Sequence, residues 1–340
     1  SEIFVAEEKD GSIDITFKFD ASALAGKSLV AFETLYTEGK EVAIHADLED
    51  EGQTIRIPEI HTTATDKVTG DHDGVVAKET TVLDEVFYKN LIPGKEYTVK
   101  GTLMVKETGE ALVVNGETVT AEKTFTAEEP DGSIILEFTF DSSALAGKHI
   151  VAFEDVEYKG ISIGSHEDLE DEDQTISYPS IHTTATDQAS GSKTMALGSS
   201  VTLVDTVTYT GLTVGKTYVV KGTIMDKASG QSIGVTAETT FTAEAADGST
   251  TVTFTFDTSV LQGKTLVVFE TLYDTNGNQI VDHSDLNDED QTVTVPVQPE
   301  NPPVVTGDDS TPMPYAVGLA AALLAVVAII AVLVKRRKQA

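Results

Sequence analysis

Three near-copies of one short segment place the strongest constraint on how this chain can fold. The segment reads "LEDEGQT" at residues 48–54, "LEDEDQT" at 169–175 and "LNDEDQT" at 286–292, and each copy leads into a strand-like run that ends in proline. Other segments repeat at the same interval, for example "PEIHTTATD" (58–66) and "PSIHTTATD" (179–187). The period of about 120 residues is the size of an ordinary domain. The sequence therefore predicts a tandem array of similar domains.

The repeats also predict where the domains begin and end. Two complete units are expected at residues 58–178 and 179–296, and residues 1–57 match only the second half of a unit. We therefore expect the chain to be the C-terminal part of a longer protein. A Pro-rich linker with a sortase-like motif is expected at 297–312, and a membrane segment with a basic tail at 313–340.

Alternating apolar and polar residues dominate each unit. Runs such as "EYTVKGTLMV" (96–105) and "SIILEFTF" (133–140) are separated by turn signals such as "NGE" and "PDGS". Hydrophobic residues make up 40% of the chain, which is enough for ordinary cores. Several short strands at this spacing are typical of two antiparallel sheets packed face to face. We predict an all-β chain of tandem Ig-like β-sandwich domains, followed by a C-terminal transmembrane helix.

The net charge and the C-terminal residues limit which classes of partner the chain can bind and on which side of the membrane it lies. The formal net charge of −33 argues against nucleic acid as a partner, because phosphate binding needs basic patches. Residues 315–334 are an uncharged apolar run followed at once by "KRRK". About 20 apolar residues span a bilayer as a helix, and a basic flank stays in the cytoplasm. The residues before this span are therefore expected outside the cell, although the chain has no cysteine.

Four polar side chains per unit fall on strand faces that otherwise carry core residues. They are Thr62, Asp84, Glu154 and Gln174 in the second unit, and Thr183, Asp205, Glu270 and Gln291 in the third. Burying such groups unpaired costs about 1–3 kcal/mol each, so we expect the four of each unit to meet. Two neighbouring carboxyl groups in an apolar site should not both ionise, so one pKa is expected to rise.

These residue types together suggest a reaction within the chain. Threonine is a potential nucleophile, and the glutamine carboxamide is an acyl donor, so attack would release ammonia and leave an ester. A histidine, a possible proton carrier, stands eight residues before each glutamine, at His45, His166 and His283. The ester would join the first and last strands of a unit, as a disulfide would in a chain that had cysteine.

The units resemble the Thr-Gln ester-bond domains, also called VaFE repeats, of Gram-positive surface adhesins. The resemblance rests on "IHTTATD", "LVDTVTY", "VVFE" and the spacing His-x7-Gln-Thr, and it covers nearly all of residues 1–296. It implies two ester cross-links, from Thr62 to Gln174 and from Thr183 to Gln291. It also implies that the reaction is promoted by Asp84, Glu154 and His166 in the second unit, and by Asp205, Glu270 and His283 in the third.

Two details of this assignment come from the residues themselves. The first threonine of each "TT" pair is chosen because it faces inward, whereas Thr63 and Thr184 are the weaker choice. The first unit keeps only Glu33, His45 and Gln53 and has no threonine or aspartate partner for them, so Gln53 is expected to stay unreacted.

The C-terminal order of Thr-Gly, spacer, apolar span and basic tail resembles the cell-wall sorting signal of Gram-positive surface proteins. It implies that a sortase cuts between Thr306 and Gly307 and joins the threonine to peptidoglycan. Val304 stands where the usual motif has proline, so the class of sortase stays open. A plain membrane anchor with a chance Thr-Gly is the alternative.

The function expected from these features is a structural stalk of an adhesin or pilus-like fibre, anchored to the wall and held in the membrane before sortase processing. It is not an enzyme with turnover, because each site reacts once with its own chain. A host ligand is expected to bind through an N-terminal region outside this sequence. We expect no cofactor and no resident metal, and His61, His72 and His182 are interpreted as surface residues.

Two other classes of function remain as alternatives. The acidic run "HEDLEDEDQ" (166–174) is rich in oxygen ligands, which would suit a calcium-binding surface repeat protein held only by its membrane helix. The run lacks the glycine and the closing glutamate of an EF-hand loop, so a solvated acidic turn is favoured. A hydrolase using Thr, His and Asp is disfavoured because its candidate residues point into a packed core.

Overall fold

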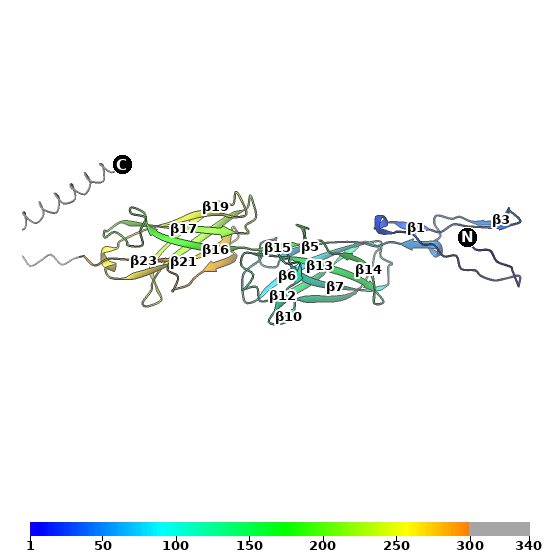
Figure 1. Ribbon diagram of the computed structural model, residues 1–340, viewed down its shortest axis with the longest axis horizontal. Helices are drawn as coiled ribbons and strands as arrows, with labels where there is room; N and C mark the ends of the chain where they lie inside the picture. The colour runs from blue at the N-terminus through cyan, green and yellow to red at the C-terminus, as the bar shows by residue number, and fades with distance from the viewer. Residues whose placement is uncertain (299–340) are drawn as a thin grey trace, which may run out of the picture. The chain divides into compact units, whose positions relative to one another are not determined.

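The computed structural model describes residues 1–298, and all of its extended secondary structure is β-strand (Figure 1). The prediction of an all-β fold is confirmed. The only helical elements among these residues are the short 3-10 turns η1 (Ser22–Leu24), η2 (Glu51–Gln53) and η3 (Ser259–Leu261). None of the helices in residues 1–298 has the length and apolar character needed to cross a bilayer. The expected sortase motif at Thr306 and Gly307 and the expected membrane segment at 313–340 lie outside the described residues.

The second repeat consists of two facing sheets and a short two-stranded sheet formed by residues 113–114 and 117–118. Its strands are β5 (Glu59–Asp66), β6 (Thr80–Lys89), β7 (Glu96–Val105), β8 (Glu110–Ala111), β9 (Val113–Val114), β10 (Glu117–Thr118), β11 (Thr120–Thr126), β12 (Gly132–Phe140), β13 (Lys148–Tyr158), β14 (Ile161–His166) and β15 (Thr175–Tyr178). One sheet has the order β12-β6-β5. The other has the order β11-β7-β13-β14, with β15 also paired to β13 and β8 to β7. All of these strand pairs are antiparallel.

The third repeat has the same plan. Its strands are β16 (Ser180–Asp187), β17 (Val201–Thr210), β18 (Thr217–Asp226), β19 (Gln231–Thr242), β20 (Gly248–Phe256), β21 (Thr265–Asp274), β22 (Gln279–His283) and β23 (Thr292–Thr294). One sheet has the order β16-β17-β20, and the other has the order β19-β18-β21-β22, with β23 also paired to β21. Each complete repeat is therefore a sandwich of a three-stranded sheet and a larger one.

Strand alternation builds a separate core in each complete repeat. In β6 every second residue is buried, and Val82 and Val86 from this strand pack with Val99 of β7 and Phe138 of β12. The third repeat has an equivalent cluster from both of its sheets. The turn that leads into the long strand β13 contains Gly147 at a φ of +77°, a left-handed conformation that costs glycine little. Each repeat thus holds its own hydrophobic core, as a domain of this size requires.

Residues 1–57 form only small paired segments. The strands are β1 (Ser28–Val30), β2 (Glu33–Thr37), β3 (Lys40–His45) and β4 (Thr54–Arg56), paired as β1-β4 and β2-β3. Residues 11–19 match β12 and β20 in sequence but form no strand. The reason is that β12 pairs with β6, and residues 1–57 contain no counterpart of β6. Apolar side chains such as Phe17, Phe19 and Ile44 are consequently exposed.

Candidate functional site

Four polar side chains meet in the core of the second repeat, between the two sheets. Thr62 comes from β5, Asp84 from β6 and Glu154 from β13, and Gln174 lies directly before β15. All four are at most 2% exposed. The Thr62 hydroxyl donates to Glu154 Oε2 at 3.0 Å, and Gln174 Nε2 donates to the same oxygen at 2.7 Å. Gln174 Nε2 also donates to the Thr62 hydroxyl, so the nucleophile and the acyl donor are in direct contact.

The third repeat holds the same group of residues. Thr183 Oγ1 donates to Glu270 Oε2 at 3.2 Å, and Gln291 Nε2 donates to that oxygen at 3.0 Å and to Thr183 Oγ1 at 2.9 Å. These three residues and Asp205 are fully buried. The structure therefore brings together, in each complete repeat, the four inward-facing residues that the sequence singles out.

Backbone pairing explains why the threonine and the glutamine meet. In the second repeat Ala64 N donates to Asp173 O at 2.9 Å, which ties the threonine strand to the residue just before Gln174. The third repeat has the matching bond from Ala185 N to Asp290 O, also at 2.9 Å. The aspartate reaches the site from the neighbouring strand, where Asp84 lies directly across from Ala64.

Both carboxyl groups of each site are buried, and burial raises the pKa of a carboxyl group. Burial raises the pKa of Glu154 to about 10, and the charge of Asp84 and a hydrogen bond with it add to the rise. Burial also raises the pKa of Asp84, to about 6. In the third repeat burial, followed by the hydrogen bond and charge of Asp205, raises the pKa of Glu270 to about 11, and burial raises the pKa of Asp205. The glutamate of each pair therefore holds a proton at neutral pH.

The location of that proton follows from the unpaired oxygens. Glu154 Oε1 and both carboxyl oxygens of Asp84 are buried and have no N–H or hydroxyl donor among residues 1–298. In the third repeat, Glu270 Oε1 and both carboxyl oxygens of Asp205 are likewise buried without such a donor among residues 1–298. An unsatisfied buried acceptor costs about 1–3 kcal/mol, so a proton held between the two carboxyl groups of each pair is the arrangement that satisfies them.

The histidines lie at the rim of each site and do not touch the threonine hydroxyl. His166 Nδ1 accepts from the backbone N–H of Thr62 at 3.2 Å, and its Nε2 lies 3.0 Å from Asp171 Oδ2. His283 Nε2 lies 3.0 Å from Asp288 Oδ2, and its backbone carbonyl accepts from Gln291 Nε2 at 3.3 Å. In this geometry His166 positions the threonine strand of the second repeat, and His283 positions the glutamine of the third. The hydroxyl proton of each threonine points to the glutamate.

The first repeat keeps part of the arrangement. Gln53 Nε2 donates to Glu33 Oε2, and His45 Nε2 lies 2.9 Å from Asp50 Oδ2. No threonine or aspartate of residues 1–57 completes the group, and Glu33 and Gln53 are only half-buried. These residues therefore make no complete site.

Two glycines that lie next to the sites are absent from the sequence-based predictions. Gly101 lies directly across from Glu154, and Gly222 lies directly across from Glu270. A Cβ atom on Gly222 would lie 2.4 Å from Phe254 Cζ and 3.3 Å from Glu270 Oε1. The glycine thus leaves space for the phenylalanine ring and the carboxyl group. The repeated segment "VKGT" (99–102 and 220–223) is the signal that could have revealed it.

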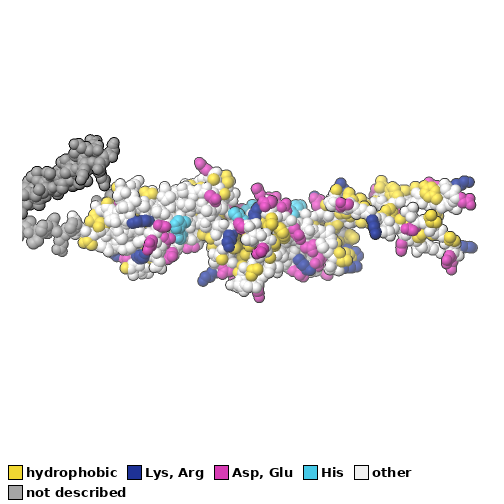
Figure 2. All heavy atoms as spheres, viewed as in Figure 1, with side chains coloured by type: hydrophobic (Ala, Val, Ile, Leu, Met, Phe, Trp, Pro, Cys, Tyr) yellow, Lys and Arg dark blue, Asp and Glu magenta, His cyan; other side chains and the backbone are white. Residues whose placement is uncertain are grey.

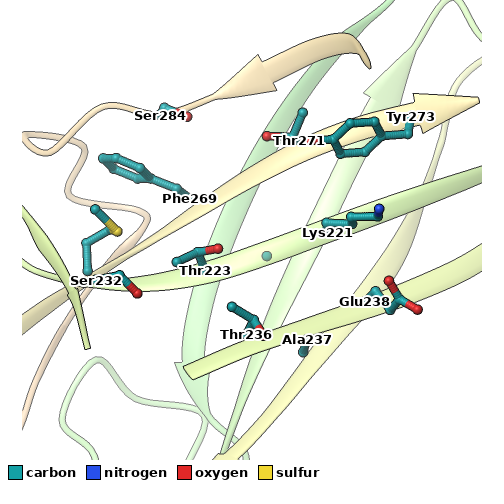
Figure 3. A pocket seen from close by; sticks show the side chains of 12 residues that line it. Lys221, Thr223, Ser232, Thr236, Ala237, Glu238, Phe269, Thr271, Tyr273 and Ser284 are labelled. Carbon is teal, nitrogen blue, oxygen red and sulfur yellow. The ribbon is translucent and has the colours of Figure 1, made fainter. Parts of the chain in front are cut away.

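The sites are sealed from solvent. A hollow of about 710 Å³ in the third repeat is lined by outward-facing side chains of β18, β19 and β21, including Lys221, Thr236 and Tyr273 (Figure 3). The hollow is lined by none of the four buried site residues, which are Thr183, Asp205, Glu270 and Gln291. A separate substrate has no access to a threonine that is fully buried. The arrangement therefore suits a reaction of the chain with itself.

The comparisons with known proteins agree with the site chemistry at the level of family. The model of the T-Q ester bond containing domain matches residues 1–57, 58–178 and 179–295. No match is found among curated proteins.

Two solved structures that match this chain show weak likenesses. A bacterial adhesin from Mobiluncus mulieris, containing intramolecular disulfide, isopeptide and ester bond cross-links, is 15% identical with a TM-score of 0.32, over 66% of this chain and 84% of that one. Red sea bream transglutaminase is 12% identical with a TM-score of 0.23, over 73% of this chain and 32% of that one. Neither TM-score is high enough to bear on fold or function. The family model, in contrast, matches the chain in three successive segments from residue 1 to residue 295, and the chain therefore belongs to the family of the T-Q ester bond containing domain.

Proposed function

We propose that this chain is the stalk of a cell-surface adhesin or pilus-like fibre, in which an ester between a threonine and a glutamine closes each complete repeat. One observation carries the proposal. A single carboxyl oxygen, Glu154 Oε2 in the second repeat and Glu270 Oε2 in the third, accepts hydrogen bonds from both the threonine hydroxyl and the glutamine amide. That oxygen touches the atom that must lose a proton and the atom that must gain one.

The reaction balances within the four side chains. The threonine Oγ1 attacks the glutamine carboxamide carbon, the new C–O bond forms and the C–N bond breaks. The hydroxyl proton passes through the glutamate Oε2 to the amide nitrogen, which leaves as ammonia. No other reactant is needed, and the products are the ester and one ammonia molecule per site.

The carboxyl pair supplies the proton relay. Glu154 and Glu270 are protonated at neutral pH because burial and the neighbouring aspartate raise their pKa values to about 10 and about 11. When Oε2 takes the threonine proton, the proton on Oε1 can move toward Asp84 or Asp205. The aspartate thus stores a proton until the amide nitrogen is protonated, and a buried position keeps water from competing.

The cross-links fit a structural role without turnover. Each site consumes its own threonine and glutamine, so it reacts once. The joined residues stand 112 positions apart in the second repeat and 108 in the third. A bond that closes such long loops restricts the unfolded chain strongly, which favours a stalk that resists unfolding.

Anchoring to the surface is the second part of the proposal and rests on the sequence. The order of Thr306-Gly307, apolar span and basic tail supports cleavage by a sortase and attachment to the peptidoglycan of a Gram-positive wall. Before that step the apolar span would hold the chain in the membrane.

The calcium-binding alternative has less support. Asp168 and Asp171 each accept a hydrogen bond from the backbone N–H two residues further on, at 2.9 and 2.8 Å. Asp171 also contacts His166. These contacts give the carboxylates a role in shaping the acidic turn, which is the solvated turn favoured by the sequence.

The intact mass of residues 1–297 tests the ester proposal. Two complete sites predict a mass lower than the sequence mass by two ammonia molecules, with Gln53 unreacted. A mass equal to that of the sequence, under neutral conditions, would contradict the ester in both repeats. Loss of a third ammonia would contradict the assignment of Gln53.

A further inference from the structure

Two histidines and an aspartate gather on the surface of the third repeat, beside the buried site. They are His182, His283 and Asp288, and their potential ligand atoms all lie within 4.8 Å of one another. The two imidazole rings have centroids 5.3 Å apart. Figure 2 shows histidine side chains grouped among acidic ones on the visible face of this repeat. Among residues 1–298, this is the one group of three histidine, aspartate or glutamate residues close enough to hold a metal ion.

Backbone contacts orient this group before any ligand binds. Asp288 Oδ1 accepts from the backbone N–H of Asp290 at 2.7 Å and of Gln291 at 3.3 Å. The other oxygen, Oδ2, therefore faces His283 Nε2 at 3.0 Å. His182 is exposed on β16, and its Nε2 lies 3.5 Å from Asp290 Oδ2, which holds the ring on the same side.

The second repeat provides a natural comparison. His61, His166 and Asp171 occupy the matching positions, and His166 keeps its 3.0 Å contact with Asp171. His61, however, stacks on Phe87 with ring centroids 4.8 Å apart and an interplanar angle of 9°. The residue across from His182 is Thr208, which offers no ring to stack on. The histidine of the third repeat is consequently free to turn toward its partner.

We propose that His182, His283 and Asp288 bind a divalent transition-metal ion, for which Zn²⁺ is the best match. Two imidazole nitrogens and one carboxylate oxygen are a donor set that zinc prefers, with water as a fourth ligand. Because the ligand atoms lie up to 4.8 Å apart, the exposed His182 ring must rotate toward the other two side chains to reach a zinc–nitrogen distance of about 2.0–2.1 Å. Asp290 would then accept a hydrogen bond from the His182 ring nitrogen that does not bind the ion. The formal net charge of −33 adds a general attraction for cations.

Metal binding would also act on the ester site, a consequence that rests on the proposed function. His283 Nδ1 is buried and has no hydrogen-bond partner among residues 1–298, whereas the matching Nδ1 of His166 accepts from the backbone of Thr62. A metal on Nε2 fixes the ring proton on Nδ1, because a neutral imidazole carries one proton. A protonated Nδ1 cannot form the bond to the threonine backbone that His166 makes in the second repeat and that is absent from the third repeat in this structure. We expect zinc to prevent this bond from forming during the reaction, and so to slow ester formation in the third repeat while leaving the second unaffected.

Calorimetric titration of Zn²⁺ into metal-free residues 1–297 tests the site directly. One zinc ion per chain is expected, and Co²⁺ should give a matching stoichiometry by visible absorption. His182→Ala should weaken zinc binding by about tenfold or more, because it removes a ligand. The matched control, His61→Ala in the second repeat, should leave the affinity unchanged. Absence of saturable binding, or equal affinity in wild type and His182→Ala, would overturn the proposal.

Exchanging the residue opposite each histidine sharpens the test. Thr208→Phe should offer His182 a ring to stack on and weaken the site, whereas Phe87→Thr should release His61 and create a second zinc site. Thermal melts confirm that each variant is folded. Two results together would contradict the stacking explanation. One is zinc binding to Thr208→Phe that is as tight as binding to the wild type. The other is no zinc binding to the second repeat of a folded Phe87→Thr variant.

The coupling to ester formation needs a separate readout. The chain is made by cell-free synthesis with either Zn²⁺ or a chelator, and peptide masses report ammonia loss from each repeat. Slower loss from the third repeat alone, absent in His182→Ala, is expected. Unchanged rates with measured zinc binding would overturn only the coupling. A chain that binds zinc but never loses ammonia would instead contradict the proposed ester and leave the metal site supported.

Discussion

Glu270 and His283 lie directly across from each other in the antiparallel pair β21–β22. The N-terminal part of strand β21 pairs instead with β23, in which Thr292 lies across from Val267. The chain thus leaves one edge of β21 after His283, makes an acidic turn and returns to the same edge just after Gln291. The constant spacing from histidine to glutamine is the length of this turn. Glu154, His166 and Gln174 repeat the arrangement in the second repeat.

The carboxyl pairs predict an unusual pH dependence in a chain that cannot form esters. In the double variant Thr62→Ala and Thr183→Ala, both glutamates stay protonated in the folded state, because their pKa values are raised to about 10 and about 11. The folded state then binds more protons than the unfolded state. The free energy of unfolding should fall as pH rises from the ordinary carboxyl pKa toward these values, by at most about 1.4 kcal/mol per pH unit for each proton.

Chemical denaturation of this variant at about pH 6 and about pH 9 measures the slope. The control adds Glu154→Gln and Glu270→Gln, which replace the protonated carboxyl groups by neutral amides of similar shape. The slope should largely disappear in the control. Equal slopes in both chains, or stability that rises with pH in the first, would show that the pairs do not hold a proton at neutral pH.

Much of this architecture could be predicted from the sequence because repetition and alternation are both visible in it. The period of about 120 residues indicates the units. The inward side of "IHTTATD" distinguishes Thr62, which is 2% exposed, from the half-buried Thr63. Glu154 and Gln174, at 1% and 0% exposed, also lie on the faces that alternation assigns to the core.

Other parts of the site depend on contacts across strands, which alternation does not reveal. The sequence does not say which atom of His166 faces the threonine strand, and the observed bond goes to the backbone rather than to the hydroxyl. It does not place Gly222 across from Glu270 either. The difference between His61 and His182 depends on the residue paired with each, Phe87 or Thr208, and so on strand register. Register is set by the whole sheet and turns.

Gly222→Ala should disturb the third site by steric crowding. The added methyl group would meet Phe254 Cζ at 2.4 Å and Glu270 Oε1 at 3.3 Å, so the ring and the carboxyl group must shift. Overpacking of this kind costs about 1–3 kcal/mol. Peptide mass spectrometry should show slower ammonia loss from the third repeat.

Gly248→Ala is the matched control for this change. Its methyl group would lie 2.5 Å from the Tyr209 hydroxyl, a similar clash that does not involve Glu270. This variant should lose stability in thermal melts but still form the ester. Loss of the ester in both variants would mean that general destabilisation, rather than displacement of the carboxyl group, prevents the reaction.

The anchoring proposal predicts a new C-terminus. In a Gram-positive host the protein should partition with the cell wall, and Thr306 should be its last residue, because a sortase cleaves between threonine and glycine. Peptide mapping of wall and membrane fractions measures this. Gly307→Ala should retain the chain in the membrane fraction. Intact peptides that span Val305 to Asp308 in the surface pool would instead indicate a plain membrane anchor.

The paired threonines allow the sharpest test of the cross-link in the third repeat. Thr183 is fully buried and contacts Glu270 and Gln291, whereas Thr184 is only half-buried and has no contact with either side chain in the described structure. Thr183→Ala should abolish one of the two ammonia losses. Thr184→Ala should retain both, and Thr183→Ser should retain both because it keeps the hydroxyl group.

Loss of the ester should also lower the stability of the third repeat. The bond would close a loop in which the joined residues stand 108 positions apart, which corresponds to about 4–5 kcal/mol in the chain-entropy account, although strain in the folded state reduces the gain. Thermal melts should therefore place Thr183→Ala below Thr184→Ala and Thr183→Ser. Mild alkali, which cleaves both esters, should lower the melting temperature of the wild type toward that of the double variant Thr62→Ala and Thr183→Ala. Ammonia loss that persists in Thr183→Ala but disappears in Thr184→Ala would reassign the nucleophile, and equal melting of all chains would mean that the bond does not stabilise the fold.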